Sequence, residues 1–263
     1  MTLLPPIIVT RPDAGGRALT DALAARGLDA LWLPAFEIGP APDEQIARAA
    51  LARVADFDLA IFVSAAAVRA TAALLEGAWP ARTAIGAVGA ATAGAVVQAI
   101  PGAASARCIA PAATDEHDAG SEAFWDALVR SAVQPRRVLL LRAEGGREWL
   151  AERLAEAGAR VTAVAVYSRR AHGASDDELA TLRRWCEAGR APAVLVTSSE
   201  AVDVLAGQID RADAREWLRT GCALATHTRI AARLREAGFA RIVLTPPRAA
   251  DIVAALEAQV ESG

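Results

Sequence analysis

Short apolar runs recur along the chain, and a polar turn and a stretch of helically spaced apolar residues follow each one. The runs are continuous rather than alternating, which is typical of parallel strands covered on both faces. After the first run come a Pro-Asp-Ala-Gly-Gly turn and a helix with Leu19 and Leu23 on one face and Gly27 at its C-terminal cap. The predicted strands are 7–10, 59–63, 84–88, 138–141, 193–196, 222–225 and 242–244.

This alternation of strand and helix predicts an α/β fold with doubly wound parallel sheets. In such folds the loops at the carboxyl ends of the strands form the functional edge. The chemistry of the chain is therefore expected in the loops that follow each predicted strand.

The chain also contains an internal repeat. Residues 9–38 resemble residues 140–169 at an offset of 131, which aligns Arg11 with Arg142. Two further blocks match, 61–68 with 195–202 at an offset of 134, and 87–92 with 223–228 at an offset of 136. The offset grows only between matched blocks, as expected for a duplicated unit with loop insertions. Two similar lobes predict a ligand-binding cleft between them.

Length and composition agree with a two-domain protein. A chain of 263 residues, 54% hydrophobic, is long enough for two lobes of about 120 to 130 residues with buried cores. The net charge of −3 argues against a nucleic-acid partner or an anionic membrane surface. The charge-free stretch 83–106 is rich in Ala and Gly, so we interpret it as a strand, a turn and a helix, not a membrane span.

Cysteine usage and the N-terminal sequence indicate a cytoplasmic location. Cys108, Cys186 and Cys222 are far apart and odd in number, which fits neither a disulfide framework nor a zinc site. The first residues lack the basic region of a signal peptide and lead directly into a strand.

Hydroxyl residues follow two predicted strands at equivalent places of the repeat. Such residues cap the next helix, or they offer hydroxyl and N–H donors to a carboxylate or phosphate at the positive end of that helix. The duplication favours binding. For the two arginines at strand ends, a role in the cleft and a solvated surface position both remain open. The candidate binding residues are Arg11, Ser64, Ala65, Gly89, Thr92, Arg142, Ser198, Ser199, His227 and Thr228.

The only tyrosine, Tyr167, aligns with Phe36 in the first repeat. Packing explains an aromatic ring at both positions, but it does not require a hydroxyl on one of them. A symmetric scaffold that handles an asymmetric substrate needs such a difference. Tyr167 is therefore the candidate catalytic residue.

An ordered set of segments resembles the uroporphyrinogen-III synthase family. The set is VTRP, FVSAAAV, AVGAAT, LLRAEGGR, VYSR and VTSSEAV, and the resemblance runs from about residue 7 to 256. It implies cyclisation of the linear tetrapyrrole hydroxymethylbilane with inversion of the last ring, in haem biosynthesis. It also implies loss of the substrate hydroxyl to give an azafulvenium-like cation, closure through a spiro intermediate, and no metal or organic cofactor. The eight carboxylates of the substrate suit hydroxyls and helix N-termini.

The family further implies two similar flavodoxin-like lobes with a crossed topology. One lobe would comprise 1–35 plus 171–263, the other 39–165, with extended linker strands near 33–38 and 164–170. Tyr167 matches the family's functional tyrosine, which assists departure of the hydroxyl, and Ser64, Thr92 and Ser198 match substrate-facing positions. Thr228 is assigned by internal symmetry with Thr92 across a two-residue gap.

Three other classes of protein can be compared with the sequence. A two-lobed binding or sensor module for an anionic small molecule would share this architecture. A nicotinamide oxidoreductase would need GxGxxG after the first strand, and residues 12–17 do not supply it. His117, His172 and His227 share no ligand spacing, so no metal site is expected. We expect a monomer, and a transient contact with the preceding pathway enzyme stays open.

Overall fold

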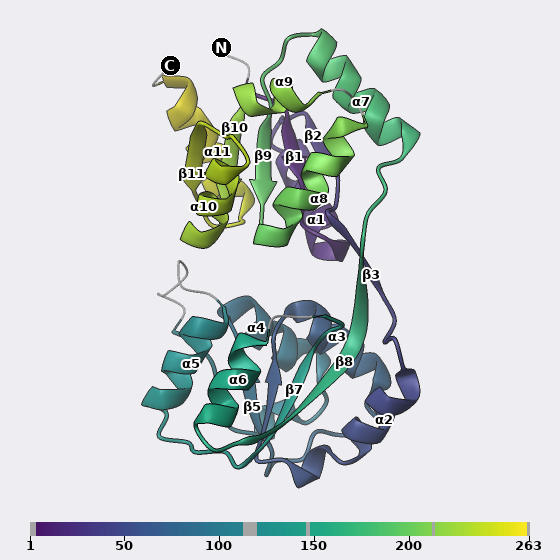
Figure 1. Ribbon diagram of the computed structural model, residues 1–263, viewed down its shortest axis with the longest axis vertical. Helices are drawn as coiled ribbons and strands as arrows, with labels where there is room; N and C mark the ends of the chain where they lie inside the picture. Colours follow the sequence, from purple (N-terminus) through teal and green to yellow (C-terminus); the bar gives the residue numbers. More distant parts are fainter. Residues whose placement is uncertain (1–3, 113–119, 146–147, 212–213, 262–263) are drawn as a thin grey trace. The chain divides into compact units, whose positions relative to one another are not determined.

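The computed structural model describes residues 4–112, 120–145, 148–211 and 214–261 (Figure 1). The chain divides into two compact units, unit 1 with residues 1–37 and 170–263, and unit 2 with residues 38–169. Each unit contains one sheet. The neighbouring strands pair in parallel wherever the register of the pair is known. The predicted α/β fold with two parallel sheets is therefore confirmed. Independent folding of lobes with the predicted boundaries stays a prediction.

Unit 1 has a five-stranded sheet in the order β2-β1-β9-β10-β11. Counted in chain order within the unit, this is 2-1-3-4-5, the flavodoxin-like order. The strands are β1 (Ile7–Val9), β2 (Ala30–Trp32), β9 (Ala193–Val196), β10 (Cys222–Ala225) and β11 (Arg241–Leu244). The helices are α1 (Asp13–Ala24), α7 (Asp176–Glu187), α8 (Ser199–Asp210), α9 (Arg215–Thr220), α10 (Thr228–Glu236) and α11 (Ala249–Glu261).

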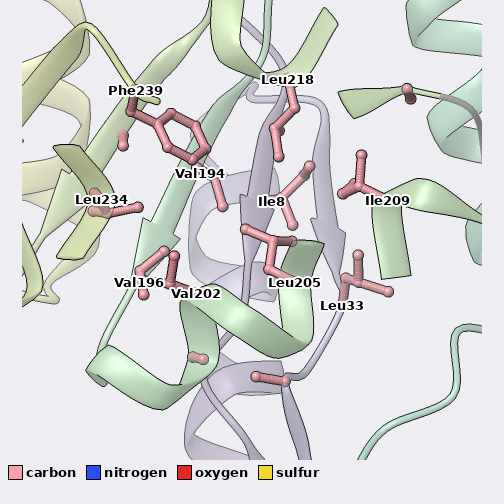
Figure 2. Packing of buried hydrophobic residues seen from close by; sticks show 14 of the residues in the cluster. Ile8, Leu33, Val194, Val196, Val202, Leu205, Ile209, Leu218, Leu234 and Phe239 are labelled. Atoms are coloured by element: carbon pink, nitrogen blue, oxygen red, sulfur yellow. The ribbon is translucent and has the colours of Figure 1, made fainter. Parts of the chain in front are cut away.

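Both faces of the unit 1 sheet are buried, which explains the continuous apolar runs. Ile8, Val194 and Val196 pack with α7, α8, α9 and α10 in one cluster (Figure 2). Their neighbours along the strands, among them Val9 and Leu195, pack with α1 and α11 in another. Successive strand residues point to opposite faces, so a strand with helices on both sides is apolar throughout.

Unit 2 repeats this plan, with its strands in the order β3-β8-β7-β4-β5-β6. The strands are β3 (Phe36–Gly39), β4 (Leu59–Phe62), β5 (Ala84–Ala87), β6 (Cys108–Ile109), β7 (Arg137–Ala143) and β8 (Arg160–Ala171). The helices are α2 (Glu44–Ala52), α3 (Ala65–Leu74), α4 (Ala90–Ala99), α5 (Ser121–Arg130) and α6 (Trp149–Glu156), with 3-10 turns η1 (Val54–Asp56) and η2 (Ala103–Ser105).

Without β3, the spatial order of the strands in unit 2 is the same as in unit 1. The chain visits them in a different sequence, because it enters unit 2 at β4 and not at the counterpart of β1. β8, β7, β4, β5 and β6 take the places of β2, β1, β9, β10 and β11. The repeat found in the sequence is thus a repeat of structure. The extra strand β3 pairs with β8, and these two extended segments carry the chain across the unit boundary (Figure 1).

All seven predicted strands are present within one or two residues, but the predicted turn after the first is wrong. Helix α1 begins at Asp13, so the two glycines lie in its first turn. A Cβ on Gly16 would lie 1.9 Å from the carbonyl oxygen of Arg11. Glycine is required at this close approach, not at a turn. The short strands β2 and β6 escaped the sequence analysis.

Residues 84–99 form β5 and α4, as the interpretation of the charge-free stretch predicted. In the part of the chain that the structure describes, no helix has the length and apolar character needed to cross a membrane. His117 lies outside the described residues.

Candidate functional site

In both units, helices begin directly after the carboxyl ends of the strands. Ser64 follows β4, and its Oγ accepts the Ala67 N–H of α3 at 3.0 Å. Ser198 follows β9, and its Oγ accepts the Ala201 N–H of α8 at 3.3 Å. The two serines are therefore equivalent N-caps, and each satisfies one of the free N–H groups of its helix.

Of these two serines, Ser64 has a second hydroxyl beside it. The hydroxyl of Tyr167 lies 3.2 Å from Ser64 Oγ, and either group can donate in this hydrogen bond. The Tyr167 side chain belongs to the buried core of unit 2 and is only 6% exposed. Its hydroxyl is thus held at the N-terminus of α3, where the helix dipole is positive.

A β-bulge places Tyr167 at this point. Arg142 of β7 pairs with Ala165 of β8, but the next residue, Ala143, pairs with Tyr167, so β8 contains one extra residue. Without the bulge, Tyr167 and Val166 would point to opposite faces of the sheet. With the bulge, both side chains lie in the same core cluster.

The two aligned arginines differ in their surroundings. Arg142 is largely buried and forms an ion pair with Glu148, which precedes α6. The backbone of Arg11 is held by a tryptophan side chain, since its carbonyl oxygen accepts the Trp32 indole N–H at 2.9 Å. The charge of Arg142 is therefore partly compensated within unit 2. Glu148 and Trp32 are not among the residues predicted from the sequence, although Trp32 ends the apolar run that forms β2.

The third pair of helix N-termini follows β5 and β10. Gly89 is the N-cap of α4, and His227 is the N-cap of α10, where its Nδ1 accepts the Arg229 N–H at 3.1 Å. The His227 ring therefore accepts through an unprotonated Nδ1 in this hydrogen bond. Since both caps follow their strands at the same distance, Gly89 and His227 are equivalent.

This equivalence corrects the internal symmetry assumed for Thr228. The strand registers match Leu59 with Ala84 in unit 2 and Ala193 with Cys222 in unit 1, which sets the offset at 138, not 136. Thr92 is the third residue of α4 and buried, whereas Thr228 is the first residue of α10 and exposed. The mate of Thr92 is therefore the buried Ile230, and the offset rises by four residues, from 134 at β9 to 138 at β10, before β10 begins. A role for Thr228 in binding stays a prediction.

The predicted residues thus form two sets, each at the carboxyl edge of one sheet. Because parallel strands end at the same edge, loops that are far apart in sequence come together there. Of the predicted residues, Ser64 and Tyr167 are in direct contact. The unit 2 set is Ser64, Ala65, Gly89, Thr92, Arg142 and Tyr167, and the unit 1 set is Arg11, Ser198, Ser199, His227 and Thr228.

Thiols and metal ligands offer little at either edge. Burial raises the pKa of the Cys222 thiol, so this thiol stays protonated at neutral pH. Across the described ranges, no three His, Cys, Asp or Glu side chains come together as metal ligands would. Hydroxyls, helix N-termini and arginines at these edges suit hydrogen bonding to an anion.

The fold and these edges define a class: two-unit α/β proteins with hydroxyls and helix N-termini at the carboxyl ends of their strands. A family model described as uroporphyrinogen-III synthase HemD matches residues 17–254. The chain belongs to the uroporphyrinogen-III synthase family, and it is an enzyme of tetrapyrrole biosynthesis. As a member, it cyclises hydroxymethylbilane with inversion of the last pyrrole ring.

Two solved structures share the fold. A mutant uroporphyrinogen III synthase from the extremely thermophilic bacterium Thermus thermophilus is 20% identical with a TM-score of 0.64, covering 98% of this chain and 100% of that one. The uroporphyrinogen-III synthetase from Helicobacter pylori is 16% identical with a TM-score of 0.58, covering 99% of this chain and 100% of that one. The likeness extends over the whole length of each chain.

Proposed function

We propose that the Tyr167 hydroxyl assists the departure of the hydroxyl group from hydroxymethylbilane. The observation that carries this proposal is the 3.2 Å contact between Tyr167 and Ser64 at the N-terminus of α3. Among the described residues of β3 and β8, Tyr167 is the aromatic residue that bears a hydroxyl. Its mate Phe36 has the ring alone.

The hydrogen bonds around Ser64 make Tyr167 a better donor. Ser64 Oγ accepts the Ala67 N–H, and in the proposed arrangement, one of the two donor directions that the geometry allows, it donates its own proton to the Tyr167 oxygen. This direction leaves the phenolic proton free for the substrate. Each bond in such a chain polarises the next. As the carbon–oxygen bond of the substrate breaks, the electron pair leaves with the oxygen, which takes the phenolic proton of Tyr167 and departs as water. The proton that is released when the ring closes restores the phenol. Tyr167 stabilises that departing oxygen.

The two edges bind the carboxylates of the substrate. Helix N-termini offer free N–H groups and a positive dipole end, which suits carboxylates in a protein of net negative charge. Arg11 and Arg142 add charge at the ends of β1 and β7. The proposed donors of unit 2 are Ser64, Ala65, Gly89 and Thr92, and those of unit 1 are Ser198, Ser199, His227 and Thr228.

A coupled assay tests the reaction itself. Freshly made hydroxymethylbilane is incubated with the protein, and the oxidised products are separated into the I and III isomers. We expect the III isomer in excess over the I isomer, which forms spontaneously. Production of the I isomer alone, at the rate without enzyme, would favour a two-lobed binding or sensor module.

The two units are proposed to be separate domains with a crossed chain. Strand β1 lies inside the unit 1 sheet, where Ile7 pairs with Ala193 of β9. Cleavage in both linkers, near Phe36 and Tyr167, should therefore leave 1–35 bound to the C-terminal piece and release a folded middle fragment. Co-purification of 1–35 with the middle fragment would contradict this assignment.

A monomer in the cytoplasm is the proposed state of the protein. Its cysteines are free thiols, and Cys108 is exposed, which suits a reducing compartment. Sedimentation of the purified protein and fractionation of the source cells test the two points. Contact with the preceding pathway enzyme stays a prediction.

A further inference from the structure

Both linkers are tied together where they reach unit 1. The backbone N–H of His172, just after β8, donates to the carbonyl oxygen of Ala35 at 2.9 Å. Gln208 of α8 donates its Nε2 to the carbonyl oxygens of Pro34 at 2.9 Å and His172 at 3.0 Å. The Gln208 side chain is buried, and its bond to Pro34 is shielded from water. One side chain thus holds both chain crossings to α8.

The His172 ring makes a second tie on the same linkers. Its Nδ1 lies 3.0 Å from Glu37 Oε1 in β3, and its Nε2 lies 3.1 Å from Glu178 Oε2 in α7. Carboxylates only accept hydrogen bonds, so both ring nitrogens can donate only in the imidazolium form. Glu178 is held independently, because it also accepts the backbone N–H and hydroxyl of Ser175 in the capping box of α7.

We propose that His172 and Gln208 are positioning residues of a linker clamp, formed with Glu37 and Glu178. The clamp holds both crossings to α7 and α8 while His172 is protonated, and it loosens when His172 becomes neutral. In the sequence, the clamp residue His172 lies between Tyr167 and Ser198, one from each predicted edge. Tyr167 lies on the strand that ends just before His172, and Ser198 caps the helix that carries Gln208.

The charges around the ring decide the direction of its titration. Burial lowers the pKa of His172, but hydrogen bonds to Glu37 and Glu178 and their negative charges outweigh this, so the pKa lies above its ordinary value of 6.5. From α8 the uncharged Gln208 donates to the backbone carbonyl oxygen of His172, and the Arg211 guanidinium after α8 donates to the carbonyl oxygen of Ala174. The charged groups that act on the ring are thus the two carboxylates.

The sign of the pH effect follows from this. A group whose pKa is raised on folding stabilises the folded state below its unfolded pKa, and the contribution is lost as pH rises through the folded pKa. The clamp should therefore be closed below about pH 6.5 and should open above the raised pKa.

Titration of His172 by NMR in the full chain is the first test. We expect a pKa above 6.5 in the unaltered protein and a lower pKa in Glu37→Gln. Glu187→Gln, at the exposed far end of α7, is the matched control and should leave the pKa of His172 unchanged. A pKa at or below 6.5, or equal shifts in the two variants, would overturn the proposal.

Hydrogen exchange at two backbone amides is the second test. The His172 amide reports on the clamp, and the Ser168 amide, which donates to Pro40 at 2.8 Å within unit 2, is the internal control. Protection of the His172 amide should fall by about two- to fivefold as pH rises through the pKa, as expected for a partly exposed ion pair. Protection of the Ser168 amide should not. Equal pH responses at the two amides would contradict the clamp.

Variants separate positioning from simple stability. His172→Gln should give low protection of the residue 172 amide at every pH. Gln208→Met keeps the bulk and should lower that protection while His172 still titrates. The ratio of wild-type to His172→Gln kcat/KM should be highest at low pH and approach one above the pKa. A ratio independent of pH would leave His172 with no positioning role. Neither exchange readout requires turnover or the proposed role of Tyr167.

Discussion

The two units share one scaffold but not one chemistry. In each, a serine that follows one of the inner strands caps a helix, Ser64 after β4 on α3 and Ser198 after β9 on α8. Tyr167 of β8 reaches Ser64 from the core of unit 2, whereas its mate Phe36 packs against the core of unit 1 without a hydroxyl. Duplication supplied two similar edges, and a single hydroxyl makes one of them a candidate for catalysis.

The cores differ as well. Leu224 of β10 is fully buried among α1 and α11, and the equivalent residue in β5 is Gly86. Phe124 of α5 fills the space over Gly86, where a Cβ would lie 2.7 Å from its ring. Equal strand orders are thus packed by different side chains, and a residue cannot be transferred between the units without repacking.

The largest expected effects are on the stability of these cores. Leu224→Ala should lower the free energy of unfolding by about 2–5 kcal/mol, since it leaves a cavity. Gly86→Ala should cost about 1–3 kcal/mol, since it forces Phe124 to shift. Urea unfolding followed by hydrogen exchange should assign the first loss to unit 1 and the second to unit 2. Gly86→Ala as stable as the wild type would show that the core of unit 2 has room.

Tyr167→Phe should lower the rate while leaving stability nearly unchanged. A positioned acid or hydrogen-bond donor contributes about 10²- to 10⁴-fold. The hydroxyl of the bilane leaves readily, so we expect the lower end, a loss of roughly ten- to a hundredfold. The product should shift towards the I isomer as the spontaneous reaction competes. The coupled isomer assay measures both effects.

Phe36→Tyr is the matched control for this change. It adds the same hydroxyl to a ring that is only partly buried against the core of unit 1. We expect wild-type rate and isomer ratio. A rate loss in Phe36→Tyr as large as that in Tyr167→Phe would mean that the assay reports ring packing and not the hydroxyl.

Ser64→Ala and Ser198→Ala should be alike in stability and unlike in rate. Each removes one helix cap, at about 0.5–2 kcal/mol. Ser64→Ala should also slow the reaction by about three- to tenfold, the equivalent of one neutral hydrogen bond. Ser198→Ala should act mainly on KM. Thermal unfolding and steady-state kinetics of the pair measure these effects, and equal losses in kcat would remove the distinction between the two caps.

The sequence predicted the fold well because its signal is local and repeated. Seven apolar runs and two matched repeats are enough to predict parallel strands and a duplicated plan. Gly16 was misinterpreted because glycine serves equally in a turn and at a close approach of the backbone. The pairing of Thr228 with Thr92 is wrong because two short similar segments can be aligned with or without a gap between them. Only the strand registers show where the gap lies.

Contacts between distant segments are the part that the sequence could not predict. The bulge that turns Tyr167 towards Ser64 depends on pairing between β7 and β8 and leaves no mark in composition. Gln208 did leave a signal, since it is a polar residue on the apolar face of α8, next to Ile209. Its partners Pro34 and His172 lie far away in the sequence.

A double-variant cycle on Tyr167 and Ser64 tests the central claim most directly. The kcat of the wild type, Tyr167→Phe, Ser64→Ala and the double variant is measured under saturating substrate, with the I and III isomers separated. If Ser64 acts through the Tyr167 hydroxyl, the double variant should be no slower than Tyr167→Phe, within about twofold. Losses that multiply would contradict the account, because the two residues would then act independently.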